Sequence, residues 1–257
     1  MRKTAVIDTH ALDWLVERLR SAGAVTAMTG AGVSAESGVP TFRGNDGLWR
    51  NYSATDLATP EAFARDPRLV WDWYRWRQGI IGRAQPNPGH LALAGLQCRL
   101  AGFTMITQNV DGLHQRAGSR DVVELHGNIW RARCARGCGF TAHETSLDRD
   151  AGQSGESDRV PVCPCGALLR PDIVWFGEAL DEDRVDRAVR SARECAVFLA
   201  VGTSALVYPA AGLPLMAGRA GAVVVEINID DTPLTPHAGL VLRGRASDVL
   251  PALEFRL

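Results

Sequence analysis

A histidine followed by a glycine is the residue in this chain best suited to moving a proton. His126 stands between Leu125 and Gly127. Its ordinary pKa of about 6.5 suits a general base near neutral pH, and Gly127 permits close approach of a ligand. Because a lone histidine at a strand end is more often structural, the role of His126 depends on its neighbours.

A glycine-rich loop follows an apolar run near the start of the chain. Residues 24–28 are apolar and partly β-branched, which predicts a buried strand. Gly30 and Gly32 follow, and glycines there would let backbone N–H groups approach a pyrophosphate. The third glycine of the usual fingerprint is missing, so the pair alone could be ordinary turn glycines. The loop continues to Phe42 and Arg43, which are costly side chains to leave idle on a surface.

Two close pairs of cysteines flank a polar linker, residues 148–159, that could bury almost nothing. Such pairs predict one tetrahedral structural Zn²⁺ that replaces a hydrophobic core, although a degenerate site or reactive thiols remain alternatives. Only one residue separates the second pair, so His143 could substitute if that pair cannot close. The predicted ligands are Cys134, Cys138, Cys163 and Cys165.

Five motifs resemble those of the sirtuins, the NAD-dependent protein-lysine deacylases, and they occur in the family's order. They cover roughly Ala24 to Ala246. The motifs are GAGVSAESGVPTFRG at 30–44, TQNVDGLH at 107–114, LHG at 125–127, RPDIVWFGE at 170–178 and VGTS at 201–204.

The resemblance implies that NAD is a consumed co-substrate. Asn109 and Asp111 would belong to the pocket for nicotinamide and its ribose, with Gln108 on the ribose, although Asn-Val-Asp-Gly by itself is an ordinary turn. Arg43 and Phe42 would contact the cofactor and shield the reacting carbon. The full set of implied cofactor residues is Gly30, Ala31, Gly32, Ser34, Ala35, Glu36, Phe42, Arg43, Trp49, Gln108, Asn109, Asp111, Gly202, Thr203, Ser204, Asn228 and Ala246.

The implied reaction transfers the acyl group of a lysine to ADP-ribose, giving nicotinamide, 2'-O-acyl-ADP-ribose and free lysine. His126 would be the general base that helps a ribose hydroxyl attack. The acyl-lysine peptide would be held by strand addition in a cleft between the sheet and the zinc module. The implied peptide-binding residues are Val174, Trp175, Phe176 and Gly177.

Tyr74 and Arg77 are three residues apart in a predicted helix, so both project from one face. A guanidinium beside a phenol hydroxyl can bind a carboxylate. The pair resembles the Tyr-x-x-Arg motif of the sirtuin subgroup that removes succinyl and malonyl groups, and the small Ala54 could make room for the acyl chain. The alternative is an exposed arginine near a packed tyrosine.

Alternating strands and helices predict the elements that position these residues. Prolines at 60 and 67 should each begin a helix, and the aromatics of residues 71–76 go round more than one face, so some should line a cavity or seam. The alternation predicts an α/β fold with a doubly wound, Rossmann-like parallel sheet. We expect a single catalytic domain over 1–257, with the NAD-binding part at 1–130 and 170–257 and an inserted zinc module at 131–169.

Composition sets the remaining expectations. The chain has 257 residues, a formal net charge of -1 and no basic run, which disfavours nucleic acid or anionic membrane as a partner. No stretch approaches the roughly 18 apolar residues of a membrane span, and the first residues lack the core of a signal peptide. We expect a cytoplasmic protein with reduced cysteines whose partners are acyl-lysine proteins or peptides. The oligomeric state is not indicated.

Three other functions compete with this interpretation. A zinc-ribbon nucleic-acid binder would leave the 30–44 loop unexplained and would need a basic stripe. A dinucleotide oxidoreductase would explain the first glycines but not the residues around Asn109 and His126. Protein mono-ADP-ribosyl transfer would use the same NAD site and share the first chemical step.

Overall fold

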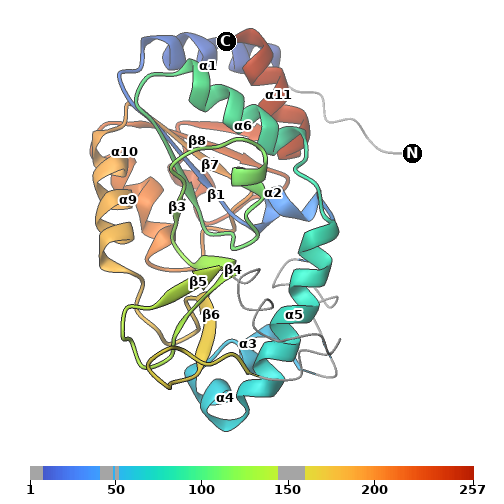
Figure 1. Ribbon diagram of the computed structural model, residues 1–257. Helices are drawn as coiled ribbons and strands as arrows, with labels where there is room; N and C mark the ends of the chain where they lie inside the picture. Colours follow the sequence, from blue (N-terminus) through green and yellow to red (C-terminus); the bar gives the residue numbers. More distant parts are fainter. Residues whose placement is uncertain (1–7, 41–48, 50–51, 144–159) are drawn as a thin grey trace.

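Six parallel strands form the main sheet in the order β3-β2-β1-β7-β8-β9. The computed structural model describes residues 8–40, 49, 52–143 and 160–257 (Figure 1). The strand order reverses between β1 and β7, which is the topological switch point where such sheets bind ligands. The strands are β1 (Val25–Thr29), β2 (Phe103–Thr107), β3 (Val123–Glu124), β7 (Val197–Val201), β8 (Val223–Asn228) and β9 (Leu240–Arg243).

Helices cover both faces of this sheet, which confirms the doubly wound, Rossmann-like fold. One face packs against α1 (Thr9–Ser21), α6 (Pro88–Arg99) and α11 (Ala246–Arg256). The other face packs against α9 (Glu182–Glu194) and α10 (Leu213–Arg219). The central strands β1 and β7 are buried along their whole length, as parallel strands between two helical layers should be.

A second, antiparallel sheet has the order β5-β4-β6 and carries the cysteines. Its strands are β4 (Gly127–Cys134), β5 (Thr141–His143) and β6 (Leu169–Ile173). Residues 148–159, the polar linker, lie outside the described residues. In Figure 1 this sheet lies beyond one edge of the main sheet, beside α5.

The mostly apolar run at 172–176 predicts a strand, and the structure corrects the bounds of this prediction. The observed strand β6 ends at Ile173 and pairs with β4 in the small sheet, not with the main sheet. A turn ends it: Gly177 has a φ of 84°, and the Trp175 N–H donates to the Glu178 carboxylate at 2.8 Å. Val174 to Phe176 therefore lie after the strand.

Three further helices build an aromatic core against the small sheet. They are α3 (Ala54–Leu57), α4 (Pro60–Arg65) and α5 (Pro67–Arg83), and each of the last two begins at the predicted proline. The indole N–H of Trp71 donates to the Leu169 carbonyl at 2.9 Å, so the α5 aromatics do line a seam between helix and sheet. No helix in the described parts of the chain is long and apolar enough to cross a bilayer.

Candidate active site

The loops that follow β1, β2 and β7 meet at one edge of the main sheet. Thr29, the last residue of β1, is in register with Thr107 of β2 and with Val201 of β7. The loops that start at Gly30, at Gln108 and at Gly202 therefore begin side by side. The sheet thus gathers residues that are far apart in the sequence, as expected for a ligand edge.

Gly30 and Gly32 allow two of these loops to touch. A side chain at Gly30 would meet Thr203 Cα at 2.8 Å, and one at Gly32 would meet the Gly202 carbonyl at 2.7 Å. The N–H groups of Gly30 and Gly32 donate to the carbonyls of Val201 and Gly202 at 3.0 and 2.9 Å. The close approach that these glycines permit is thus between two segments of this chain, and both N–H groups are used there rather than left free for a pyrophosphate.

Ser34 is the centre of a buried polar cluster under this edge. It lies in α2 (Ala31–Ala35), and its hydroxyl donates to the Asp111 carboxylate at 2.7 Å. The same oxygen accepts from the Asn109 side-chain amide at 3.0 Å, and that amide also donates to the Gly30 carbonyl. Burial raises the pKa of Asp111, against the hydrogen bonds from the Leu113 N–H and from Ser34. The cluster joins the two motifs that the resemblance assigns to NAD.

Gln108 and Thr203 connect the other loops. The Gln108 amide donates to the Thr203 hydroxyl at 2.9 Å, and the Asn228 amide donates to the Thr203 carbonyl at 2.8 Å. Thr203 is buried, while Ser204 beside it is half-buried. These bonds hold the ends of β2, β7 and β8 together around the switch point.

Two histidines lie below Ser34, and sequence reasoning gave neither a role. His90 and His114 are almost fully buried, with ring centroids 4.8 Å apart. Burial lowers the pKa of His90 to about 4, and burial together with His90 lowers that of His114 to about 3. Both are therefore neutral at pH 7. Asn87, Pro88 and His90 do mark a helix start, but no sequence signal shows what the helix faces.

The hydrogen bonds define how each of these rings is protonated. The Asn87 N–H donates to His90 Nδ1 at 3.4 Å, so His90 carries its proton on Nε2 and directs it at Ser34. Thr29 donates to Thr107 and lies 2.8 Å from His114 Nε2, so that nitrogen carries the proton. The bare Nδ1 of His114 is buried without a hydrogen-bond partner among the described residues.

The Nε2 nitrogen of His126 accepts no hydrogen bond from the residues that the structure describes. Its Nδ1 lies 2.9 Å from the Gln108 carbonyl, and because a carbonyl can only accept, Nδ1 must carry the proton. The neutral ring then has its lone pair on Nε2. Burial lowers the pKa of His126, against the bond to Gln108, so the ring is neutral at pH 7. The half-buried ring thus satisfies the electronic requirement for a general base.

The residues around His126 fix its backbone. Gly127 has a φ of 87°, and a side chain there would lie 2.0 Å from the Asp172 carbonyl, so only glycine fits. The Val174 N–H donates to the His126 carbonyl at 3.0 Å. Arg131 pairs with Glu124 and Asp172 at 2.7 and 3.0 Å, which ties the strands before and after His126 together.

The segment Val174 to Gly177 lies next to this histidine and has an exposed apolar side chain. Phe176 is 50% exposed, whereas Trp175 is buried. The N–H groups of Val174 and Phe176 donate to the carbonyls of His126 and Ala58. The Trp175 N–H is used by Glu178, so strand addition here would use carbonyl groups and the Gly177 N–H.

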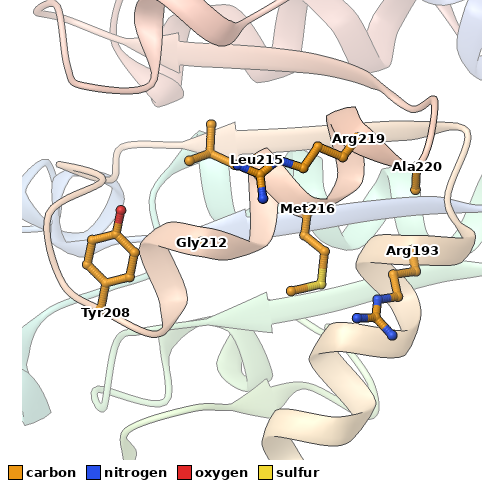
Figure 2. Close-up of a pocket in the computed structure, with 7 residues that line it drawn as sticks. All are labelled: Arg193, Tyr208, Gly212, Leu215, Met216, Arg219 and Ala220. Atoms are coloured by element: carbon orange, nitrogen blue, oxygen red, sulfur yellow. The ribbon is translucent and has the colours of Figure 1, made fainter.

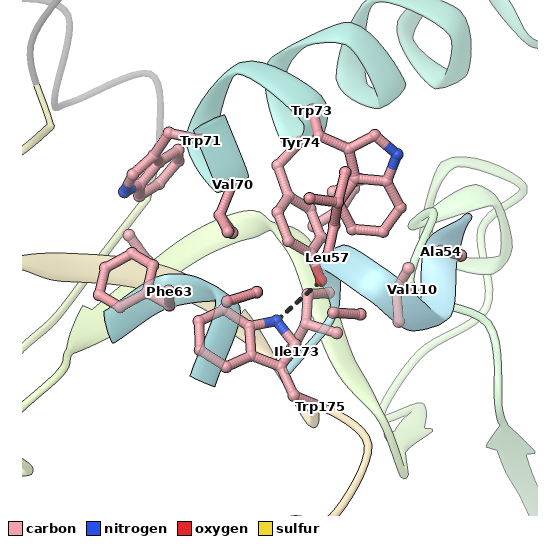
Figure 3. Packing of buried hydrophobic residues seen from close by; sticks show 14 of the residues in the cluster. Ala54, Leu57, Phe63, Val70, Trp71, Trp73, Tyr74, Val110, Ile173 and Trp175 are labelled. Atoms are coloured by element: carbon pink, nitrogen blue, oxygen red, sulfur yellow. Dashed lines mark hydrogen bonds between the residues drawn. The ribbon is translucent and has the colours of Figure 1, made fainter. Parts of the chain in front are cut away.

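Tyr74 is buried in the aromatic core, and Arg77, three residues further along α5, is half-buried. Trp175 Nε1 donates to the Tyr74 hydroxyl at 2.9 Å, and Figure 3 shows this bond. Arg77 stacks on Trp73, with its guanidinium carbon 5.3 Å from the ring centroid. Burial lowers the pKa of Arg77 and raises that of Tyr74. Tyr74 is therefore packed, and Arg77 is only partly accessible to solvent.

The four cysteines converge. Their sulfur atoms all lie within 4.8 Å of one another, with Cys134 3.6 Å from Cys165 and Cys138 3.5 Å from Cys163. Zinc bonded to four thiolates at about 2.3 Å would place the sulfurs about 3.8 Å apart, so the cluster fits one structural zinc. The short spacing of the second pair does not prevent closure. His143, on β5, is not in the group.

The remaining implied cofactor residues are found in different parts of the chain. Phe42 and Arg43 are outside the described residues. Trp49 is buried in the aromatic core, where its ring centroid is 6.4 Å from that of Trp76. The Glu36 carboxylate accepts from Ser247 at the start of α11, which places it next to Ala246. Ala31 is half-buried and Ala35 is exposed on α2.

The chain combines a doubly wound sheet, a polar cluster at the switch point of that sheet and a four-cysteine module. Together these features define a dinucleotide-binding α/β protein. The family description "Sir2 family" matches residues 30–209. This match covers more than half of the chain, so the chain belongs to the Sir2 family. The resemblance to the sirtuins is confirmed.

Several relatives and solved structures are similar to this protein over most of its length. NAD-dependent protein deacylase 2 of Pyrobaculum aerophilum is 54% identical over 240 residues, which are 93% of each chain. A Sir2 homologue in complex with NAD has a TM-score of 0.85 and 46% identity, and the match covers 95% of this chain and 92% of that one. A Sir2 structure with p53 peptide and NAD⁺ has a TM-score of 0.81 and 33% identity, with 93% and 95% covered.

Proposed function

We propose that this protein uses NAD and one water molecule to remove each acyl group from protein lysines, giving nicotinamide, 2'-O-acyl-ADP-ribose and free lysine. The single observation that carries the proposal is the 54% identity, over 93% of the chain, to a relative named as an NAD-dependent protein deacylase. The geometry supports it, because a neutral histidine with a free Nε2 adjoins the polar cluster at the switch point.

NAD would be held by the loops at the sheet edge and would supply the ADP-ribose that accepts the acyl group. Asn109, Asp111 and Ser34 form the buried end of that site, and Gln108, Thr203 and Asn228 form its other wall. Their polar atoms are mutually bonded, so the site is organised in advance of binding. The proposal also includes contacts of Phe42 and Arg43 with the cofactor, as the resemblance to the sirtuins implies.

His126 acts as the general base of the proposed reaction. The Gln108 carbonyl holds its Nδ1–H, which directs the lone pair of Nε2 toward the substrate. Because the pKa of His126 is lowered by burial, the base is already deprotonated at pH 7 and can take a proton from a ribose hydroxyl.

The acyl-lysine peptide would lie along Val174 to Gly177. The N–H groups of Val174, Trp175 and Phe176 are all bonded within the chain, so the peptide would donate to the carbonyl groups of this segment. The p53 peptide in a related Sir2 structure supports a peptide substrate. The exposed Phe176 would pack against the peptide side chains.

Tyr74 and Arg77 give the proposed preference for succinyl and malonyl groups in addition to acetyl. Tyr74 accepts a hydrogen bond from Trp175, which leaves its own proton to donate. A half-buried guanidinium and a phenol proton on the same helix would together complement a carboxylate at the end of an acyl chain. Ala54, which is buried in the same core, would leave room for that chain.

The four-cysteine module is proposed as an inserted structural unit at about 131–169, within a single catalytic domain over 1–257. Four sulfur ligands would leave no open position on zinc, so the metal would stabilise the fold and take no part in the reaction. The six cysteines are unpaired thiols, which fits the expected cytoplasmic setting.

Incubation of the protein with an acetyl-lysine peptide tests the proposed function. Free lysine should appear only when NAD is added, in equal amount to the nicotinamide released. Deacylation without NAD, or NAD cleavage that leaves the acyl-lysine intact, would contradict it.

A further inference from the structure

A cavity lies away from the sheet edge, between α9 and α10. Its volume is about 610 Å³, and Figure 2 shows it lying along one side of α10. None of its residues belongs to the candidate active site. The lining residues are Arg193, Tyr208, Gly212, Leu215, Met216, Arg219 and Ala220.

The charge of this cavity is positive and uncompensated. Arg193 and Arg219 line it, and no lining residue is acidic. Neither arginine forms a salt bridge or hydrogen bond with another residue in the described ranges, whereas Arg187 on the same helix pairs with Asp121. Both stand in the last turn of their helix, where a cation offsets the helix dipole. That interaction leaves the guanidinium donors available, which favours a ligand with carboxylate groups.

The wall beside the two arginines is apolar and open. Leu215 and Met216 lie between Tyr208 and the arginines (Figure 2). Tyr208 is 72% exposed. Small-molecule sites usually bury most of their ligand, so this open surface is better suited to a segment of chain held elsewhere on the protein. A flexible methionine can adapt to different side chains of such a segment.

The cavity begins close to the ligand edge of the sheet. Tyr208 follows Ser204 by four residues, which span at most about 14 Å. From there α10 runs back along the sheet for its 7 residues, which is about 10 Å. A peptide bound at the ligand edge could therefore reach Tyr208 with roughly four extended residues and Arg219 with roughly eight.

We propose that this cavity binds an acidic segment of the acylated protein, several residues from the acyl-lysine. The inference rests on the proposed deacylase function, since the lysine must be held at the sheet edge. Glutamate or aspartate side chains of this segment would pair with Arg193 and Arg219. Apolar side chains of the same segment would cover Leu215 and Met216. The site would make the enzyme prefer acyl-lysines that have acidic flanking sequence.

Peptides that differ only in their flanks test the proposal. One carries glutamates and the other glutamines, at roughly four to eight residues from the acyl-lysine on either side. The glutamate flank should lower KM by about 3- to 10-fold without changing kcat. The preference should shrink between about 50 and about 300 mM NaCl. It should be lost in Arg193→Gln/Arg219→Gln and kept in Arg190→Gln, an exposed arginine of α9 outside the cavity lining.

Three results would overturn the proposal: no flank preference although a short acyl-lysine peptide is turned over, a preference that persists in the double variant, or an equal loss in Arg190→Gln. Fluorescence anisotropy of the labelled long peptides, without NAD, measures the same preference when no turnover is seen. That arm separates failure of the cavity from failure of the deacylase function. Displacement of the glutamate peptide by inorganic phosphate at similar concentration would indicate a small-anion site and would also overturn it.

Discussion

The indole nitrogen of Trp175 donates a hydrogen bond to the hydroxyl of Tyr74 at 2.9 Å. Trp175 lies in the segment proposed to hold the peptide, and Tyr74 lies on α5, so one bond joins the peptide site to the proposed acyl pocket (Figure 3). Both residues are buried, which fixes the phenol where its proton can be donated to an acyl group.

Arg77→Met should weaken desuccinylation and spare deacetylation. The loss should be about 2 to 4 kcal/mol of transition-state binding, because a buried carboxylate would lose its charged partner. Comparison of kcat/KM for succinyl-lysine and acetyl-lysine peptides measures the difference. Tyr74→Phe is the matched comparison, because it keeps the ring and removes only the uncharged hydroxyl. It should lower kcat/KM for succinyl-lysine relative to acetyl-lysine by less than Arg77→Met does. Equal losses on both substrates would show that the pair serves only helix packing.

His126→Ala should fold and bind NAD but turn over acyl-lysine at least ~100-fold more slowly, since a positioned general base is lost. Single-turnover assays with NAD and peptide both saturating give the rate, and calorimetry gives the NAD affinity. His237→Ala, an exposed histidine far along the chain, is the control and should be active. Near-normal turnover of His126→Ala would reject the assignment.

The two buried histidines should make the protein sensitive to acid. Their folded pKa values of about 4 and about 3 lie below the unfolded value of about 6.5. The unfolded chain therefore binds protons first, and stability present above pH 6.5 is lost as the pH falls toward 4 and then 3. Each histidine contributes up to about 1.4 kcal/mol per pH unit in that window.

His114→Phe should flatten this dependence. The phenyl ring cannot be protonated, although the lost bond to Thr29 should cost about 1 kcal/mol at pH 7. Denaturant unfolding at several pH values between 7 and 4 measures the slope. A His237→Asn control should retain the full slope, and an unchanged slope in His114→Phe would refute the assigned cause.

The protein should contain one zinc, and Cys165→Ser should weaken its binding and destabilise the small sheet. Activity should fall only as that sheet unfolds, because the ion is not the reagent. Elemental analysis and thermal unfolding measure the two effects, with the exposed Cys98→Ser as control. Protein purified without chelator and lacking zinc would contradict this prediction.

The sequence predicts the main sheet well because its strands are continuous apolar runs between capped helices. It also predicts the zinc ligands, since cysteine spacing limits them to a small set. The sequence does not decide whether Cys163 and Cys165 can both bind, because closure of this pair depends on the turn between Val162 and Leu168 rather than on spacing.

Other features depend on tertiary placement and leave no local signal. The strand ending at Ile173 joins the small sheet because of the turn at Gly177, which a run of apolar residues does not reveal. His90 and His114 come together from α6 and α7 (Leu113–Arg116) only after the sheet has formed. The contact of Gly32 with Gly202 likewise follows from the order of the strands. The sequence alone predicts only a contact of Gly32 with the cofactor.

Mass spectrometry of the products formed from NAD and an acyl-lysine peptide tests the central claim most directly. A deacylase of the proposed kind should give unmodified lysine peptide and ADP-ribose that has gained the mass of the acyl group, in a one-to-one ratio. A peptide that keeps its acyl group and gains ADP-ribose would instead show mono-ADP-ribosyl transfer, and would contradict the account.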